Sequence, residues 1–155
     1  MQDNTSLEVG KLLSNTYAYC IQLSSQEAIN TLEAAEKKCL NIDTSSLHAL
    51  EIKRRVAELK LQILCDHRAR FSLVENSRQN LIEVGFTNLE REITNEIYFV
   101  IYCEKIEKTN TAKEVLGKLI EKIQIKLNSI DDKSGAEYSF YLDSLNNSNS
   151  RLKKY

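Results

Sequence analysis

The stretch SSQEAINTLEAAEKKCL, residues 24–40, has the pattern of one amphipathic helix. It contains the pair Ala28–Leu32, in which a bulky residue follows a small one four positions later. The same pair recurs at Ala69–Leu73 and again at Ala112–Leu116. A recurrence at intervals of about 42 residues is typical of a repeated helical hairpin, and it predicts that residues 24–40 form the second helix of such a unit.

The composition favours helices throughout the chain. It has no Pro and only four Gly among 155 residues, and these two residue types break helices and build the turns of sheet proteins. We therefore predict an all-α protein. Since this length is common for a single domain, we expect one helical domain over residues 1–145 and a polar, flexible tail over residues 146–155.

Capping signals divide the chain into segments. Ser24, Thr87, Thr111 and Ser134 each stand three residues before a Glu, the spacing of a capping box, and Gly85 suits the end of a helix. The pattern predicts helices at 5–23, 25–40, 45–65, 67–84, 88–108, 111–129 and 135–145. Paired in order, the first six form three stacked antiparallel hairpins and the seventh is a C-terminal capping helix. An irregular helical bundle is the alternative.

Ala28, Leu32 and Ala35 follow a small–bulky–small spacing at the start of their helix. The chain thereby resembles a degenerate tetratricopeptide-type helical-repeat protein, with a period closer to the long-helix variety of kinesin light chains and bacterial peptide-pheromone receptors. Asn76 and Leu119 replace the last small residue in the later hairpins. No hairpin has the Trp-x-x-Leu-Gly opening of the family, and no Pro closes a repeat. The resemblance implies a stack of hairpins whose first helices line a concave surface.

Bulk properties argue against several classes of partner. The net charge is −1, so no strong field attracts nucleic acid or an anionic membrane. No apolar run reaches the length of about 18 residues that spans a bilayer, and the N-terminus lacks the apolar core of a secretory leader. The four cysteines have no C-x-x-C spacing. We expect free thiols in a reducing compartment, and therefore a cytoplasmic protein.

Catalytic and metal sites find little support in the sequence. The chain has two histidines, and His48 stands beside Glu51 as a surface pair would. The string CDHR, residues 65–68, falls at a predicted corner between helices, where we expect Asp66 to cap the following helix. Glu-x-x-His repeats, H-E-x-x-H, phosphate-binding loops and nucleophile elbows are absent from the sequence. We predict no enzyme activity, no cofactor and no metal.

A stripe of polar and aromatic residues runs along the predicted fifth helix at spacings of three and four. Tyr and Arg are enriched at the hot spots of interfaces. The predicted partner-binding residues are Arg91, Asn95, Tyr98, Tyr102 and Lys105, with His48 and Arg55 one period earlier and Tyr17 one period before those. A solvated face with half-buried tyrosines is the structural alternative.

Three hypotheses of function follow. The first is a non-catalytic adaptor, a helical-repeat module that binds a protein or peptide. The second is a compact immunity, inhibitor or chaperone protein with one specific partner, which a pull-down giving a single stoichiometric partner would favour. The third is self-association through the C-terminal helix, where Tyr138, Tyr141 and Leu142 share an arc.

Overall fold

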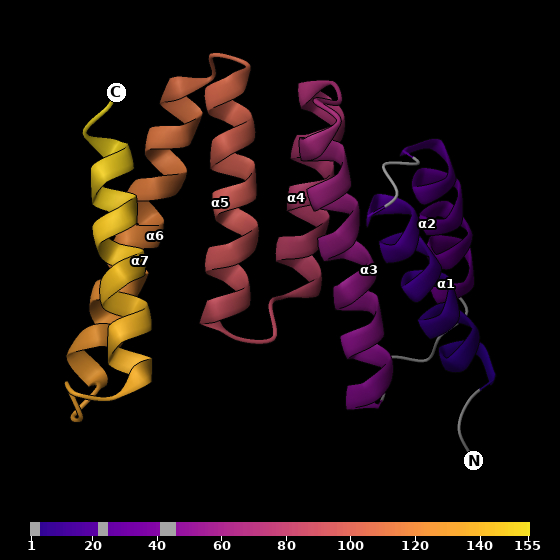
Figure 1. The fold of residues 1–155 in the computed structure, drawn as a ribbon, viewed down its shortest axis with the longest axis horizontal. Coiled ribbons are helices and arrows are strands. Elements are labelled where there is room, and N and C mark those ends of the chain that lie inside the picture. The colour runs from indigo at the N-terminus through magenta and orange to yellow at the C-terminus, as the bar shows by residue number, and fades with distance from the viewer. Residues whose placement is uncertain (1–3, 22–24, 41–45) are drawn as a thin grey trace. The chain divides into compact units, whose positions relative to one another are not determined.

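The structure is a computed structural model that describes residues 4–21, 25–40 and 46–155, with the side chains of residues 17, 19–21 and 25 left aside. The described residues form seven α-helices and no strand, which confirms the all-α class (Figure 1). The helices are α1 (Asn4–Ile21), α2 (Ser25–Cys39), α3 (Leu47–Asp66), α4 (Phe71–Val84), α5 (Leu89–Lys105), α6 (Thr109–Ser129) and α7 (Ala136–Leu152). The chain divides into two compact units, residues 1–88 and residues 89–155, whereas the composition led us to expect one domain.

The N-terminal unit, residues 1–88, is built from two helical hairpins. Helix α1 packs against α2, α3 packs against α4, and α3 also contacts both α1 and α2. The apolar faces of α1, α2 and α3 share a core, which holds α3 against the first hairpin because burial removes apolar surface from water. The buried residues of this core are Val9, Leu13, Ala28, Leu32, Ala35, Cys39, Ala49, Ile52, Val56, Leu59 and Ile63.

The Ala–Leu pair marks a buried helix face in two of the three hairpins. Ala28 and Leu32 on α2 are buried, and so are Ala112 and Leu116 on α6. On the second hairpin, however, Ala69 precedes the start of α4 and Leu73 is 44% exposed. The buried face of α4 is instead formed by Val74, Ser77 and Leu81.

Two turns of the chain share one hydrogen-bonded form. At the ends of α3 and α5, the backbone N–H groups of Ala69 and Lys108 donate to the carbonyl five residues earlier, at 3.0 and 2.8 Å. This is the Schellman motif. The preceding residues, Arg68 with φ 50° and Glu107 with φ 62°, adopt the left-handed conformation that Gly usually supplies. The second and third hairpins therefore turn in the same way without a shared turn sequence.

The predicted caps met different outcomes. Gly85 ends α4 with φ 90°, which confirms it as the C-cap, while Ser24 lies outside the described residues. The N-caps predicted at Asp66, Thr87, Thr111 and Ser134 are wrong. Helix α3 runs through Asp66, and α6 begins earlier, at Thr109, than its predicted cap. The hydroxyls of Thr87 and Ser134 donate to nearby carboxylates instead.

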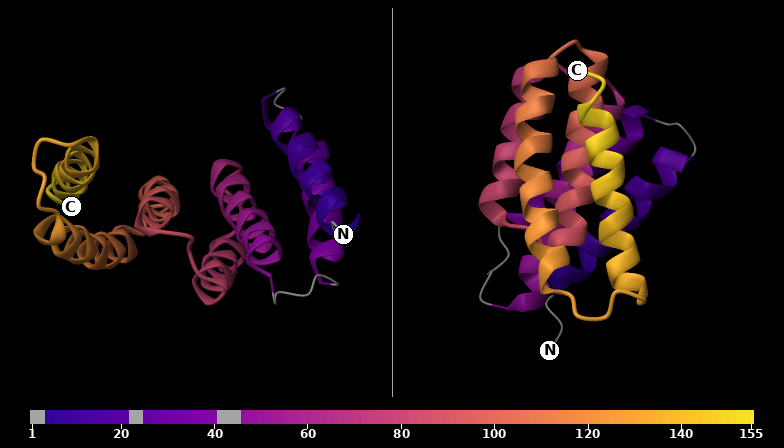
Figure 2. Two further views of the ribbon diagram at one scale, coloured as in Figure 1. Left: turned by 90° about the horizontal axis from the view of Figure 1, so that it is seen from below. Right: turned by 90° about the vertical axis from the view of Figure 1, so that its left-hand side faces the viewer.

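The C-terminal unit, residues 89–155, packs α5 against α6 and α6 against α7. Figure 2, right, shows α6 and α7 running side by side in opposite directions, with the C-terminus beside the α5–α6 turn. The buried residues of its core are Ile93, Leu119, Ile123, Leu127 and Tyr141. Each of the three helices contributes to this core, so the seventh helix covers the apolar face that the third hairpin leaves open.

The prediction of a flexible tail from residue 146 is corrected by the end of α7, which continues to Leu152. The Ser148 side chain is buried, and the Arg151 guanidinium pairs with the Glu104 carboxylate on α5 at 2.5 Å. The Tyr155 hydroxyl also donates to Glu104. We call Glu104, Arg151 and Tyr155 the C-terminal clasp. Sequence polarity was misleading here, because these polar groups find partners on α5.

Candidate functional site

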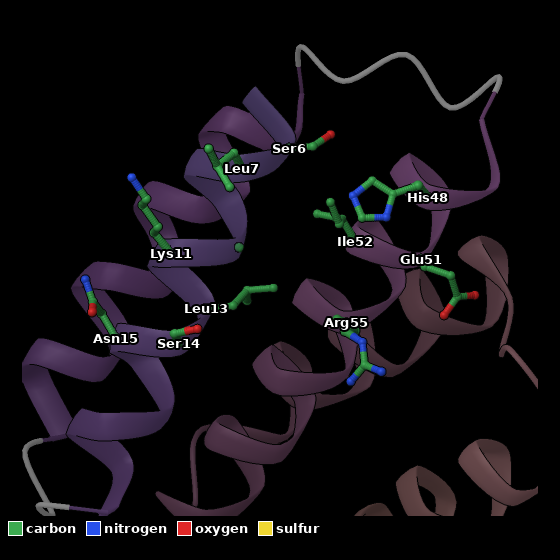
Figure 3. Close-up of a pocket in the computed structure, with 11 residues that line it drawn as sticks. Ser6, Leu7, Lys11, Leu13, Ser14, Asn15, His48, Glu51, Ile52 and Arg55 are labelled. Carbon is green, nitrogen blue, oxygen red and sulfur yellow. The ribbon is translucent and has the colours of Figure 1, made fainter. Parts of the chain in front are cut away.

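A groove of about 630 Å³ lies between α1 and α3, the first helices of the two hairpins in the N-terminal unit. We call it the α1–α3 groove, and Figure 3 shows it in close-up with the lining residues drawn as sticks. Its volume falls within the range of about 300–1,000 Å³ common for ligand sites. It is lined by Ser6, Leu7, Gly10, Lys11, Leu13, Ser14 and Asn15 from α1 and by His48, Glu51, Ile52 and Arg55 from α3.

The floor of the groove is apolar. Leu13 and Ile52 point into the space between the helices (Figure 3), and both belong to the core of the unit. Leu7 also lines the groove and is 51% exposed. An apolar side chain that stays half exposed in a concave site is available to bury surface against a partner.

Gly10 leaves space at the groove where any other residue would place a side chain. A Cβ atom added to Gly10 would meet no atom within 4 Å, so close packing does not require the glycine. A glycine inside a helix costs about 0.5–1 kcal/mol relative to alanine. Its effect here is to widen the groove and expose the α1 backbone to it.

The rim of the groove is polar and carries positive charge. Ser6 and His48 face each other across one end, and Arg55 lies at the other end (Figure 3). His48 and Arg55 are both exposed. They are seven residues apart, which places them about 10 Å apart along the axis of α3.

Glu51 is the one acid on the rim, and its carboxylate is already engaged. It pairs with Arg54 at 2.7 Å and accepts a hydrogen bond from the Thr87 hydroxyl at 2.8 Å. These bonds lower the pKa of Glu51 below its usual value, and the bond from Arg54 has the larger effect. They do so because they stabilise the charged form of the carboxyl group. Figure 3 shows this carboxylate turned away from α1, so its charge is directed out of the groove.

The predicted stripe is divided by the structure. His48 and Arg55 reach the α1–α3 groove together, while the Tyr17 side chain lies outside the described residues. On α5, Lys105 is exposed and Arg91 and Tyr98 are half-buried. The remaining two are Asn95 and Tyr102, which are 0% and 1% exposed.

The burial of Asn95 and Tyr102 shows that the α5 part of the stripe is not one solvated face. The Asn95 amide donates to the Arg91 carbonyl at 2.8 Å on its own helix. A buried amide must satisfy its donors, and a carbonyl four residues back offers an acceptor. Helical spacing therefore placed these residues on one line without revealing which part of the line is buried.

Sequence reasoning missed the groove residues Gly10, Leu13 and Ile52. A signal existed in Gly10, because a glycine within a strong helical pattern marks either a packing need or a functional reason. Leu13 and Ile52 carried no separate signal, since residues that line a groove and residues of the core have the same apolar pattern.

A second groove, of about 320 Å³, lies in the C-terminal unit between α5 and α7. We call it the α5–α7 groove. Ile93 and Ile97 contribute from α5, and the α7 side is polar. The Oγ of Ser148 is buried there without a hydrogen-bond partner among the described residues. The lining on the α7 side consists of Ser144, Asn147, Ser148, Ser150, Arg151 and Lys154.

The terminal helix keeps part of its predicted apolar arc on the surface. Tyr141 is buried in the core of the unit, whereas Phe140 and Leu142 are 40% and 37% exposed. The Tyr141 ring lies 5.7 Å from the Lys126 ammonium group, and burial raises the pKa of its hydroxyl. Self-association through this helix stays a prediction.

The described residues offer neither a metal-binding cluster nor a membrane-spanning helix. Among them, no group of three or more His, Cys, Asp or Glu side chains is placed to hold a metal ion. None of the described helices is long and apolar enough to cross a membrane. Cys39, Cys65 and Cys103 are buried, and none of the three forms a disulfide within the described residues. No protein family, curated protein or solved structure matches this chain.

Proposed function

We propose that this protein is a non-catalytic helical-repeat module that binds a protein or peptide in the α1–α3 groove. The observation that carries the proposal is the groove itself, with an apolar floor at Leu13 and Ile52 and a polar rim at His48 and Arg55. A concave site that combines apolar surface with a few polar groups is the usual form of a binding site. In helical-repeat proteins, such sites lie on the first helices of successive hairpins.

Two further features support a repeat of the tetratricopeptide type. The turns after α3 and α5 share the Schellman motif, and each unit has a groove beside the first helix of a hairpin. The buried thiols of Cys39, Cys65 and Cys103 agree with a reducing compartment. On that ground we keep the proposal of a cytoplasmic adaptor.

A peptide selection with two matched variants tests the proposal. A library of random peptides displayed on phage is selected against the intact protein, and the enriched peptides are then measured against Gly10→Phe and Gly117→Phe. Both glycines lie inside helices, and an added Cβ meets no atom within 4 Å at either position. Only Gly10 lines the groove. Thermal melts of both variants verify that they fold.

We expect the enriched peptides to lose at least tenfold in affinity for Gly10→Phe, because the ring occupies the groove, and to bind Gly117→Phe as they bind the wild type. Equal affinity for both variants would place the binding site elsewhere. A selection that enriches no peptide would contradict the proposal of a peptide-binding module.

A further inference from the structure

We propose that the α1–α3 groove takes an extended peptide segment in which an acidic side chain stands two residues from an apolar one, with Arg55 binding the carboxylate. This inference rests on the proposed function and adds the chemistry of the partner. It follows from the charges around the groove and from the distance between its polar residues.

The charge that the groove offers is positive. Arg55 is exposed, and its guanidinium makes no hydrogen bond or ion pair within the described residues. Lys11 on α1 is also exposed and, within the same residues, has no such partner. Glu51 is neutralised by Arg54 at 2.7 Å. Lys11, however, lies on the side of α1 turned away from α3 (Figure 3). A carboxylate on the partner would therefore meet the Arg55 guanidinium, and Glu51, the one acid among the described lining residues, is already held by Arg54.

An arginine side chain can bind the carboxylate of the peptide in one defined orientation, which a diffuse positive potential cannot do. Its planar guanidinium donates two parallel hydrogen bonds to a carboxylate, which fixes the orientation of the acid as well as attracting it. Arg55 lies next in sequence to Arg54, whose guanidinium is held by Glu51. Arg54 thus holds Glu51 in place, and Arg55 is available to bind a ligand.

The dimensions of the groove fit a short stretch of extended chain. His48 and Arg55 lie about 10 Å apart along α3, which is the length of about three extended residues. Between them, Ile52 and, from α1, Leu13 offer the apolar floor. A peptide that places its carboxylate at Arg55 thus brings its next inward-facing side chain onto this floor. That side chain is expected to be apolar.

The test uses synthetic eight-residue peptides with a fluorescent label and one central Leu. In three otherwise equal series, the two positions that lie two residues before and two residues after Leu hold Glu, Gln or Lys, because alternate side chains of an extended chain face the same side. Binding is measured by fluorescence anisotropy. The proteins are the wild type, Arg55→Gln, Arg55→Glu and Lys113→Glu. Lys113 is an exposed base of α6 outside the groove, so its variant changes the net charge equally without touching the site.

We expect the Glu series to bind the wild type about tenfold or more tightly than the Gln series, since a hydrogen bond assisted by charge is stronger than a neutral one. The Lys series should bind weakest. Arg55→Gln should remove the preference for Glu, Arg55→Glu should reverse it in favour of Lys, and Lys113→Glu should keep it. Raising the salt concentration should reduce the difference in affinity between the Glu, Gln and Lys series, because salt screens the attraction between charges.

The results separate this inference from the proposed function. If all three series bind the wild type equally and Gly10→Phe abolishes binding, the groove binds peptides but the acidic preference is wrong. If Lys113→Glu changes the preference as much as Arg55→Glu does, the effect is one of net charge and the role of Arg55 is refuted. If the phage selection also enriches nothing, the proposed function itself fails.

Discussion

The α1–α3 groove has an apolar floor of Leu13 and Ile52 beside the exposed Arg55, whereas the α5–α7 groove is lined on its α7 side by serine, asparagine, Lys154 and the arginine that pairs with Glu104. Both lie beside the first helix of a hairpin, yet their volumes are about 630 and 320 Å³. In the second groove Arg151 is bound to Glu104 at 2.5 Å. In the first, Arg55 has no such acid among the described residues.

The difference between the two grooves lies in whether the arginine beside each one has a partner among the described residues. Where α7 meets α5, Arg151 pairs with Glu104 within the chain and links the two helices. Where α3 meets α1, Glu51 is the one acid among the described residues that line the groove, and Arg54 binds it on the outer side. Gly10 contributes no side chain there. The first arrangement stabilises the fold, and the second leaves binding capacity for a partner.

The largest expected effect separates the buried half of the predicted stripe from its exposed half. Tyr102→Ala should lower the free energy of unfolding by about 3–5 kcal/mol, because Tyr102 is 1% exposed and truncation of a large aromatic side chain in a core leaves a cavity. Arg55→Ala, at an exposed residue, should change it by less than about 0.5 kcal/mol. Urea denaturation followed by circular dichroism measures both. Similar losses for the two variants would break the contrast between the two halves.

The next effect concerns the C-terminal clasp. Glu104→Ala removes the acceptor of both Arg151 and Tyr155 and should cost about 1–2 kcal/mol, since hydrogen bonds to a charged group are stronger than neutral ones. Amide hydrogen exchange should rise in the last turns of α7 and stay unchanged in α1 and α3. Lys118→Ala, which removes an exposed pair with Glu114, serves as the control. Unchanged exchange in α7 would show that the clasp does not hold the helix.

A smaller effect compares the two glycines. Gly10→Ala and Gly117→Ala should each raise the free energy of unfolding by about 0.5–1 kcal/mol, because alanine is the better helix former and both positions have space for a methyl group. Thermal melts at one pH measure this. Destabilisation by Gly10→Ala alone would mean that the N-terminal unit packs more tightly at Gly10 than the open groove allows.

The smallest effect is a dependence on pH. The pKa of Glu51 is lowered in the folded protein, so its contribution is present above the pKa of the unfolded chain, about 4.3, and is lost as the pH falls through the folded pKa. Because the side chain is 35% exposed, we expect only about 0.3 kcal/mol. The stability difference between wild type and Glu51→Gln should therefore shrink from pH 7 to pH 3. A difference that grows toward low pH would contradict this sign.

Much of the fold could be predicted from the sequence, because helix formation depends on local signals. The all-α class followed from the absence of Pro. The capping signals divided the chain into seven helices as the structure does, although the N-caps predicted at Asp66, Thr87, Thr111 and Ser134 are wrong. The extension of α7 could not be predicted, because Arg151 and Tyr155 bind Glu104, which is distant in sequence. For the same reason periodicity grouped Tyr102 with Arg55: it reports which residues share a line on a helix, but burial depends on neighbouring helices.

The most direct measurement of the binding surface is a methyl NMR titration of the intact protein with one of the acidic peptides. The account predicts that the methyl signals of Leu13 and Ile52, on the floor of the α1–α3 groove, shift with a common saturating dependence on peptide concentration. The signals of Ile93 and Ile97, in the α5–α7 groove, should stay in place. Shifts of Ile93 and Ile97 with Leu13 and Ile52 unmoved would contradict the claim that the α1–α3 groove is the binding site.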